Sequence, residues 1–82
     1  MAYTSAEFRA KTTELLEGIA ANQIIDKGYT RAIIYVPDIV VSELAAYISA
    51  NPSDPRTIGY ESVGEDLFIK PKLPLKVRLQ RI

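Results

Sequence analysis

The chemistry open to this chain is limited first by two residue types that it lacks. Its 82 residues include no histidine and no cysteine. Nucleophilic catalysis needs a serine, threonine or cysteine held against a base, and that base is most often histidine. A zinc site would have to be built from carboxylates alone, whereas structural zinc sites use thiolates and imidazoles. The composition therefore predicts a protein that is not an enzyme and that has no catalytic residue, no metal site and no cofactor.

One segment has the glycine spacing of a phosphate-binding loop, from Gly59 to Gly64. Such a loop also needs a lysine and a hydroxyl residue directly after its second glycine. Here Glu65 and Asp66 follow instead, and their carboxylates would repel a phosphate. Glu61 completes the one acidic cluster of the chain, but its spacing does not match an EF-hand. We interpret the segment as the solvated bend of a β-hairpin rather than as a nucleotide or cation site.

Basic side chains gather at the C-terminal end without any acidic residue among them. They are Lys70, Lys72, Lys76, Arg78 and Arg81. The whole chain has a net charge of zero, so long-range attraction to nucleic acid or anionic lipid is not its main design. No aromatic residue interleaves with these lysines, as stacking on bases would require. Three interpretations stay open: a charged strand that discourages aggregation, a surface for a protein partner, and a nucleic-acid surface. Of the two binding interpretations, the sequence favours the protein partner.

Five tyrosines are many for a chain of this length. Tyrosine is enriched at protein interfaces because its ring is apolar and its hydroxyl can stay hydrogen-bonded. We expect Tyr35 and Tyr47 to be half-buried in the core. We assign Tyr29 and Tyr60, together with the five basic residues, to a candidate partner-binding surface.

The first element that must position these residues is a helix from about Ser5 to Ala21. Thr4 and Glu7 have the spacing of a capping box, in which the hydroxyl accepts a bond from a free helix amide. An apolar stripe recurs at helical spacing, formed by Phe8, Leu15, Leu16, Ile19 and Ala20. Gly18 weakens the last turn by up to ~1 kcal/mol relative to alanine, so the helix could end there.

Residues 22–36 allow two interpretations. Two β-prone runs, 23–26 and 30–36, flank a glycine-containing turn and favour a hairpin. The alternative is that the first helix continues to Lys27 and ends with Gly28 as its C-terminal cap. Pro37 then suits the start of a second helix, which Asn51 and the proline after it would end.

The segment 57–82 has the pattern of β-structure. Residues 57–63 and 67–70 flank the acidic bend and form a second candidate hairpin. Leu73, Leu75, Val77 and Leu79 then alternate with polar residues, which indicates a strand with one buried and one basic face. Pro71 and Pro74 cannot donate ladder hydrogen bonds, so we expect this strand at a sheet edge.

Together these elements predict an α+β fold with two helices and a small antiparallel sheet, in the order α-β(β)-α-β-β-β. We expect a single domain over residues 1–82, with a helical half (1–50) and a β-rich half (57–82).

Residues 5–48 resemble the bacteriophage head-to-tail joining (head-completion) protein W family. The similar features are the capped first helix ending near Gly18, the Asp26-Lys27-Gly28 turn, and the segment Val41–Ile48 at the start of the second helix. The resemblance implies a helix, a short hairpin and a helix, in a non-enzymatic virion joint that binds neighbouring subunits around the portal. It transfers no functional residue to this chain.

A small core without disulfides or metals usually depends on association for stability. We therefore predict a non-enzymatic structural or assembly protein that binds other protein subunits, as a homo-oligomer or within a larger assembly, in the cytoplasm or in a virion. The alternative is a small regulatory binding module or inhibitor of a partner protein. No apolar run approaches the ~20 residues that span a bilayer, so we expect no membrane partner.

Overall fold

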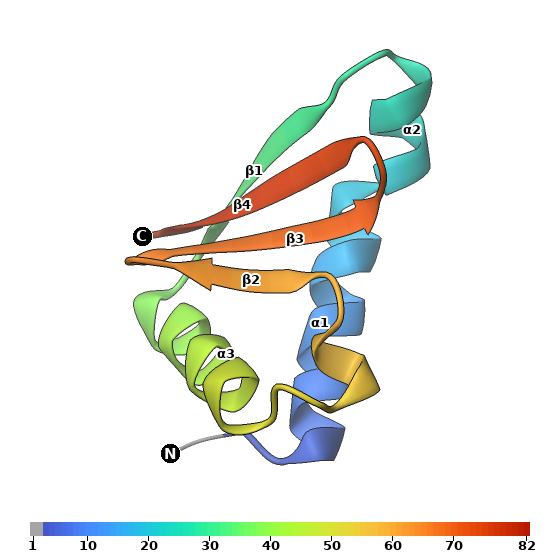
Figure 1. Ribbon diagram of the computed structural model, residues 1–82. Coiled ribbons are helices and arrows are strands. Elements are labelled where there is room, and N and C mark those ends of the chain that lie inside the picture. Colours follow the sequence, from blue (N-terminus) through green and yellow to red (C-terminus); the bar gives the residue numbers. More distant parts are fainter. Residues whose placement is uncertain (1–2) are drawn as a thin grey trace.

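The computed structural model describes residues 3–82 and shows a four-stranded sheet with its helices packed on one face (Figure 1). The elements are α1 (Ser5–Ile19), α2 (Ala21–Asp26), β1 (Arg31–Val36), α3 (Asp38–Ala50), a 3-10 turn η1 (Pro55–Thr57), β2 (Tyr60–Val63), β3 (Asp66–Lys72) and β4 (Leu75–Arg81). The expected α+β class is confirmed. Among residues 3–82, no helix combines the length and the apolar character needed to cross a membrane.

Helix α1 begins where the capping box predicts. The Thr4 Oγ1 atom accepts a hydrogen bond from the Glu7 amide at 3.2 Å and donates one to Glu7 Oε1 at 3.0 Å. The helix ends at Ala20, whose φ of 48° and ψ of 53° lie in the left-handed region. Because that conformation cannot continue a right-handed helix, α1 stops there and a separate helix, α2, begins at Ala21.

The predicted hairpin of residues 23–26 with 30–36 is wrong. Residues 23–26 lie in helix α2, whose end is closed by bonds from the Gly28 amide to the Ile25 carbonyl (2.8 Å) and from the Tyr29 amide to the Ile24 carbonyl (3.1 Å). Gly28 has a φ of 84°, which only glycine adopts without strain. The alternative with Gly28 after a longer helix is nearer to the structure, although Ala20 divides that helix in two. Local helical bonds and the burial of Ile24 and Ile25 against the core outweigh their β propensity.

The strand order is β1-β4-β3-β2, and this corrects two expectations. Strand β1 pairs with β4 in parallel, with Ala32 opposite Val77 and Ile34 opposite Leu79, so the sheet is mixed rather than antiparallel. Strand β4 is interior, not at an edge. The two prolines that suggested an edge, Pro71 in β3 and Pro74 in the following turn, lie outside β4. The amides of β4 are therefore all available for pairing on both sides.

The hairpin around the acidic bend is confirmed, but its first strand begins at Tyr60 rather than at Thr57, which lies in η1. Strands β2 and β3 pair antiparallel, from Tyr60 opposite Ile69 to Val63 opposite Asp66. Gly64 lies in the bend with a φ of 62°. The adjacent strands β3 and β4 also pair antiparallel, with Ile69 opposite Val77.

A single core joins the helical and β-rich halves. Leu75, Val77 and Leu79 are buried, as their alternation predicts, but Leu73 is 83% exposed because it lies in the turn before β4. At the centre of the core, Phe8 of α1 stacks on a tyrosine of α3. The buried side chains of α3 are Val41, Leu44 and Tyr47. The helices thus cover one face of the sheet.

Candidate protein-docking surface

The other face of the sheet carries a set of side chains that no described helix covers. Side chains alternate along a strand, so the residues next to the buried ones point to this side. We call it the outer sheet face and define it by Arg31, Ile33, Tyr35, Phe68, Lys76 and Arg78. Strand register places them side by side, with Ile33 opposite Arg78, and Arg78 also opposite Phe68. Five of the six, all except Tyr35, border a shallow depression together with Ala32.

Three of the five predicted basic residues form ion pairs. Lys70 Nζ lies 3.3 Å from Glu61 Oε2, Arg78 Nη2 lies 2.9 Å from Asp66 Oδ1, and Arg81 Nε lies 2.7 Å from Asp38 Oδ1. Exposed pairs of this kind contribute only about 0–1 kcal/mol to stability. Their larger effect is to neutralise the basic end that the sequence predicts, so less positive charge remains for a phosphate backbone.

The predicted basic face is also divided between the two sides of the sheet. Arg81 lies opposite the buried Val36 and pairs with the first residue of α3, so it belongs to the helical side. Lys72 reaches the helical side as well, where it donates a hydrogen bond to Asn22 of α2. Lys76 lies on the outer sheet face with its ammonium 4.2 Å from the centre of the Phe68 ring. The five residues therefore do not form one surface.

The tyrosines do not lie where the sequence predicts. Tyr29 is 59% exposed in the loop before β1, but Tyr60 turns its ring onto Phe8, with the two centroids 5.5 Å apart. Burial raises the pKa of Tyr60 to about 12, and the neighbouring Thr12 offsets this only in part. Tyr60 is thus mainly a core residue.

Tyr47 is buried as expected, but Tyr35 is 68% exposed, so its expected place in the core is wrong. The reason is register, because Tyr35 is opposite Gln80 on the outer sheet face.

Strand β1 is the feature that sequence reasoning missed. Its even-numbered residues Ala32, Ile34 and Val36 face the core, while Ile33 and Tyr35 are 55% and 68% exposed. A strand that is apolar on both sides is typical of a strand covered on both faces. That signal was present in the sequence Arg31–Val36, but it could not show that one face would stay uncovered.

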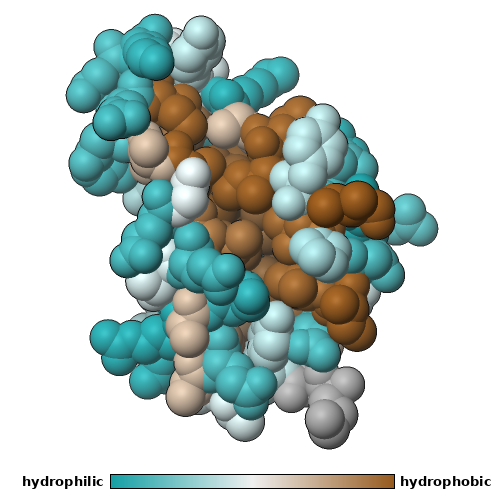
Figure 2. Space-filling view, turned by 180° about the vertical axis from the view of Figure 1, so that it is seen from behind, coloured by the Kyte–Doolittle hydropathy of each residue, from teal (hydrophilic) through white to brown (hydrophobic). Residues whose placement is uncertain are grey.

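Apolar surface also extends around β1 to the helical side. Figure 2 shows brown surface running from the region of α2 through the centre to the side where β1 leads into α3, next to the hydrophilic surface of α1. The half-buried apolar side chains of these elements include Leu15, Ile24, Ile25, Ala32, Ile34 and Val40. Exposed apolar side chains therefore lie on both sides of the sheet around β1.

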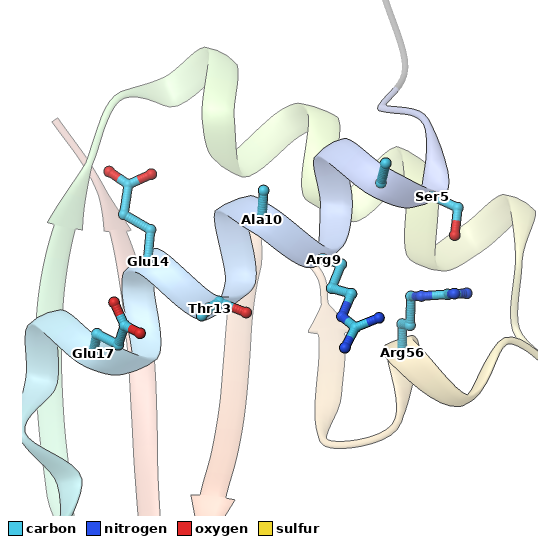
Figure 3. Close-up of a pocket in the computed structure, with 8 residues that line it drawn as sticks. Ser5, Arg9, Ala10, Thr13, Glu14, Glu17 and Arg56 are labelled. Carbon is cyan, nitrogen blue, oxygen red and sulfur yellow. The ribbon is translucent and has the colours of Figure 1, made fainter.

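A groove along α1 is another concave surface (Figure 3). Arg9 and Arg56 lie together at one end of it, and Glu14 and Glu17 lie further along the helix. All of its lining residues are exposed. Arg56 is already paired with a carboxylate, that of Asp54, at 3.2 Å. The groove is therefore open polar surface rather than a site that could hold a reacting group away from water.

The acidic residues of the hairpin bend do not assemble into a cation site. Glu61 pairs with Lys70, and Asp66 pairs with Arg78. Within residues 3–82, no three acidic side chains lie close enough together to hold a metal ion.

No family model, no curated protein and no solved structure matches this chain.

Proposed function

We propose that this chain is a non-enzymatic assembly subunit that works by docking onto other protein subunits. One observation carries the proposal: strand β1 is apolar on both faces, yet Ile33 and Tyr35 on its outer side are more than half exposed. Burying an exposed isoleucine or tyrosine against a partner contributes roughly 1.5–3 kcal/mol before the costs of association. The outer sheet face and the β1 edge are the surfaces that gain most from a partner.

The charges of the outer sheet face favour a protein partner over nucleic acid. Arg78 is already paired with the Asp66 carboxylate, and the ammonium of Lys76 lies over the Phe68 ring. Nucleic-acid affinity depends on several free cations that displace counterions along the phosphates. A mixed surface of paired charges and exposed aliphatic and aromatic groups is typical of protein interfaces.

The resemblance to the head-to-tail joining protein W family suggests one setting, a subunit of a phage particle. The resemblance supports nothing more specific than this setting, because helix α2 lies where the hairpin of that family is expected. A small regulatory module that binds one partner is the second candidate. The two edge strands of the sheet support this second candidate. Strand β1 has six mostly apolar residues, whereas β2 has four residues and carries Glu61. A single open edge suits a closed one-to-one complex.

Measuring the native mass across a range of concentrations tests the proposal, by light scattering and native mass spectrometry. An assembly subunit is expected to form dimers that grow into rings or larger complexes, or to copurify with particles. A complex of fixed one-to-one stoichiometry with a single partner would favour the regulatory module. A lone monomer at every concentration would contradict the assembly function.

A charge-reversal variant tests whether association, measured as the native mass, depends on the outer sheet face. Lys76→Glu is expected to weaken association roughly tenfold, because it replaces the cation over the Phe68 ring with a carboxylate on a surface that meets a partner. Lys27→Glu is the matched control: it makes the same charge change at an exposed turn beyond α2, and it should leave the mass distribution unchanged. Equal effects of both variants would show that net charge, not this face, controls association.

A further inference from the structure

Strand β1 presents one unpaired backbone edge. It has a single neighbour in the described sheet, β4. The Lys76 amide donates to the Thr30 carbonyl at 2.9 Å, and the Ile82 amide donates to the Val36 carbonyl at 3.1 Å. Even-numbered residues therefore direct their backbone groups to β4. Because these directions alternate along a strand, Arg31, Ile33 and Tyr35 direct their N–H and C=O groups outward.

This edge lacks the devices that usually prevent pairing. Natural edge strands are protected by shortness, proline, bulges or inward charges. Strand β1 contains no proline and no lysine, and its pairing with β4 runs from Arg31 to Val36 without a register shift. The opposite edge differs, because β2 has four residues and includes Glu61. The contrast indicates that the β1 edge is kept free for a strand.

We propose that the occupant is a second copy of this chain, whose β1 pairs antiparallel with the first about a two-fold axis at Ile33. This inference rests on the proposed docking function and names its partner. In this register Ile33 is opposite Ile33 of the second copy, and Arg31 is opposite Tyr35. Every outward N–H and C=O group of Arg31, Ile33 and Tyr35 then finds a partner. A register centred two residues earlier or later leaves some of these groups unpaired.

Charge and polarity fit an identical copy. The chain has no net charge, so two copies do not repel each other at long range. Arg31 is the one charged residue of β1. In the proposed register the two arginines lie roughly 14 Å apart along the strands, beyond the ~8 Å screening length at physiological salt. Each guanidinium faces the tyrosine ring of the other copy, which is a favourable cation–π arrangement.

Dimerisation through β1 would also bury apolar surface on both sides of the sheet. A two-fold axis perpendicular to the sheet keeps the helical side of both copies on one side. The half-buried apolar surface around Ile34 and Val40 then continues into that of the second copy. On the other side, Ile33 and Tyr35 of both copies form a cluster. The same register also places Tyr29, which is 59% exposed, opposite Pro37 of the second copy.

Disulfide trapping tests the register directly, because the chain has no cysteine of its own. Residues opposite each other in a hydrogen-bonded antiparallel pair have Cα atoms about 5.5 Å apart, within the range of a disulfide. Ile33→Cys is expected to form a covalent dimer under mild oxidation, and a mixture of Arg31→Cys and Tyr35→Cys to form a heterodimer. Val63→Cys is the matched control, since Val63 is exposed to a similar extent (52%) on the opposite edge of the sheet. It should stay monomeric on non-reducing gels run after the same oxidation.

A charge on the edge provides the independent measurement. Ile33→Lys is expected to raise the dimer dissociation constant at least tenfold in sedimentation equilibrium, and Val63→Lys to leave it unchanged. Circular dichroism of both variants checks that the monomer remains folded. If Ile33→Lys fails to fold, the milder Tyr35→Lys replaces it, because Tyr35 is 68% exposed.

The outcomes separate this inference from the proposed function. A dimer that Ile33→Cys traps and Ile33→Lys dissociates supports the inference. An oligomer that persists in Ile33→Lys, or that Val63→Cys traps equally well, overturns the β1 interface while the docking function stands. A wild-type chain that binds only an extended peptide of another protein at β1 also overturns it. A wild-type monomer without any partner overturns both.

Discussion

At the residue scale, Tyr60 carries a hydroxyl group that the core buries without giving it a good partner. Among the described residues, no atom meets ordinary hydrogen-bond geometry with this oxygen. An unsatisfied buried hydroxyl destabilises the folded state, so removing it is neutral or favourable. We expect Tyr60→Phe to keep or raise the free energy of unfolding, by up to about 1 kcal/mol in chemical denaturation. Tyr35→Phe, which removes an exposed hydroxyl, is the control and should be neutral.

The same hydroxyl gives a pH dependence of known sign. Burial raises the folded-state pKa of Tyr60 to about 12, whereas an unfolded tyrosine titrates near 10. The stability linked to this group is complete below about pH 10 and is lost as pH rises from 10 to 12, because only the unfolded chain releases the proton. Tyr60→Phe should therefore show a shallower alkaline loss of stability than the wild type. Identical alkaline limbs would mean that the hydroxyl is accessible in the folded chain.

Asp54 affects how the stability of the fold changes at acid pH. The Tyr47 hydroxyl donates to its carboxylate, and so does the Arg56 amide at 2.9 Å, and these bonds hold the pKa of Asp54 below its usual value. A lowered pKa stabilises the fold above about pH 4, and the stabilisation is lost as pH falls through the folded-state value. We expect Asp54→Asn to lower stability at neutral pH and to flatten the acid limb of the unfolding curve.

Tyr47→Phe checks the cause of the Asp54 effect. It removes the hydroxyl that contributes most to the low pKa, but leaves the Phe8–Tyr47 ring stacking at 4.3 Å in place as a Phe–Phe contact. The acid limb should flatten in the same direction as in Asp54→Asn. An unchanged acid limb in both variants would contradict the assignment.

At the scale of elements, the junction between α1 and α2 depends on one strained residue. Ala20 has a φ of 48°, in a region that costs a non-glycine residue roughly 1 kcal/mol. We expect Ala20→Gly to raise stability by up to about 1 kcal/mol, reduced by the greater flexibility of glycine in the unfolded chain. The melting temperature measures it.

Glycine substitutions nearby serve as paired controls. Gly28→Ala should destabilise, because Gly28 has a φ of 84°, whereas Gly18→Ala should stabilise, because Gly18 is helical and a Cβ there meets open space. A destabilising Ala20→Gly with both controls as expected would show that the alanine side chain packs usefully at the junction.

Elements with strong local signals could be predicted from the sequence. The capping box at Thr4, the proline before α3, the glycine bend between β2 and β3 and the alternation in β4 each involve neighbouring residues. The segment Asn22–Asp26 could not, because two isoleucines that favour strand become helical through contacts with the core.

The pairing of strands that are far apart in the chain could not be predicted from the sequence either. Strand β1 joins β4 through a crossover of nearly forty residues, so neither the parallel pairing nor the interior place of β4 has a local signal. The same holds for the candidate surface. The basic residues were visible, but their neutralisation by Glu61, Asp66 and Asp38 depends on strand register and on the position of α3. The exposure of the outer side of β1 depends on which face of the sheet the helices cover, and no local sequence pattern specifies that face.

At the scale of the whole molecule, we expect stability to depend on protein concentration, because the proposed dimer covers the open β1 edge. A chain of 82 residues buries a modest share of its surface, so an interface that covers Ile33 and Tyr35 adds substantially to its stability. When folding and dimerisation are linked, mass action raises the melting temperature with protein concentration. For a domain of this size we expect about 3–6 °C for each tenfold increase in concentration.

Differential scanning fluorimetry or calorimetry over two to three decades of concentration, roughly the span in which mass action is resolved, measures this slope. Ile33→Lys should abolish the concentration dependence, since a charged edge no longer pairs and the monomer then melts at one temperature. Val63→Lys should keep the wild-type slope, because it adds the same charge at the β2 edge. A wild-type melting temperature that stays constant with concentration would show that the monomer supplies all of the stability. The apolar sides of β1 would then have to be explained by a different partner.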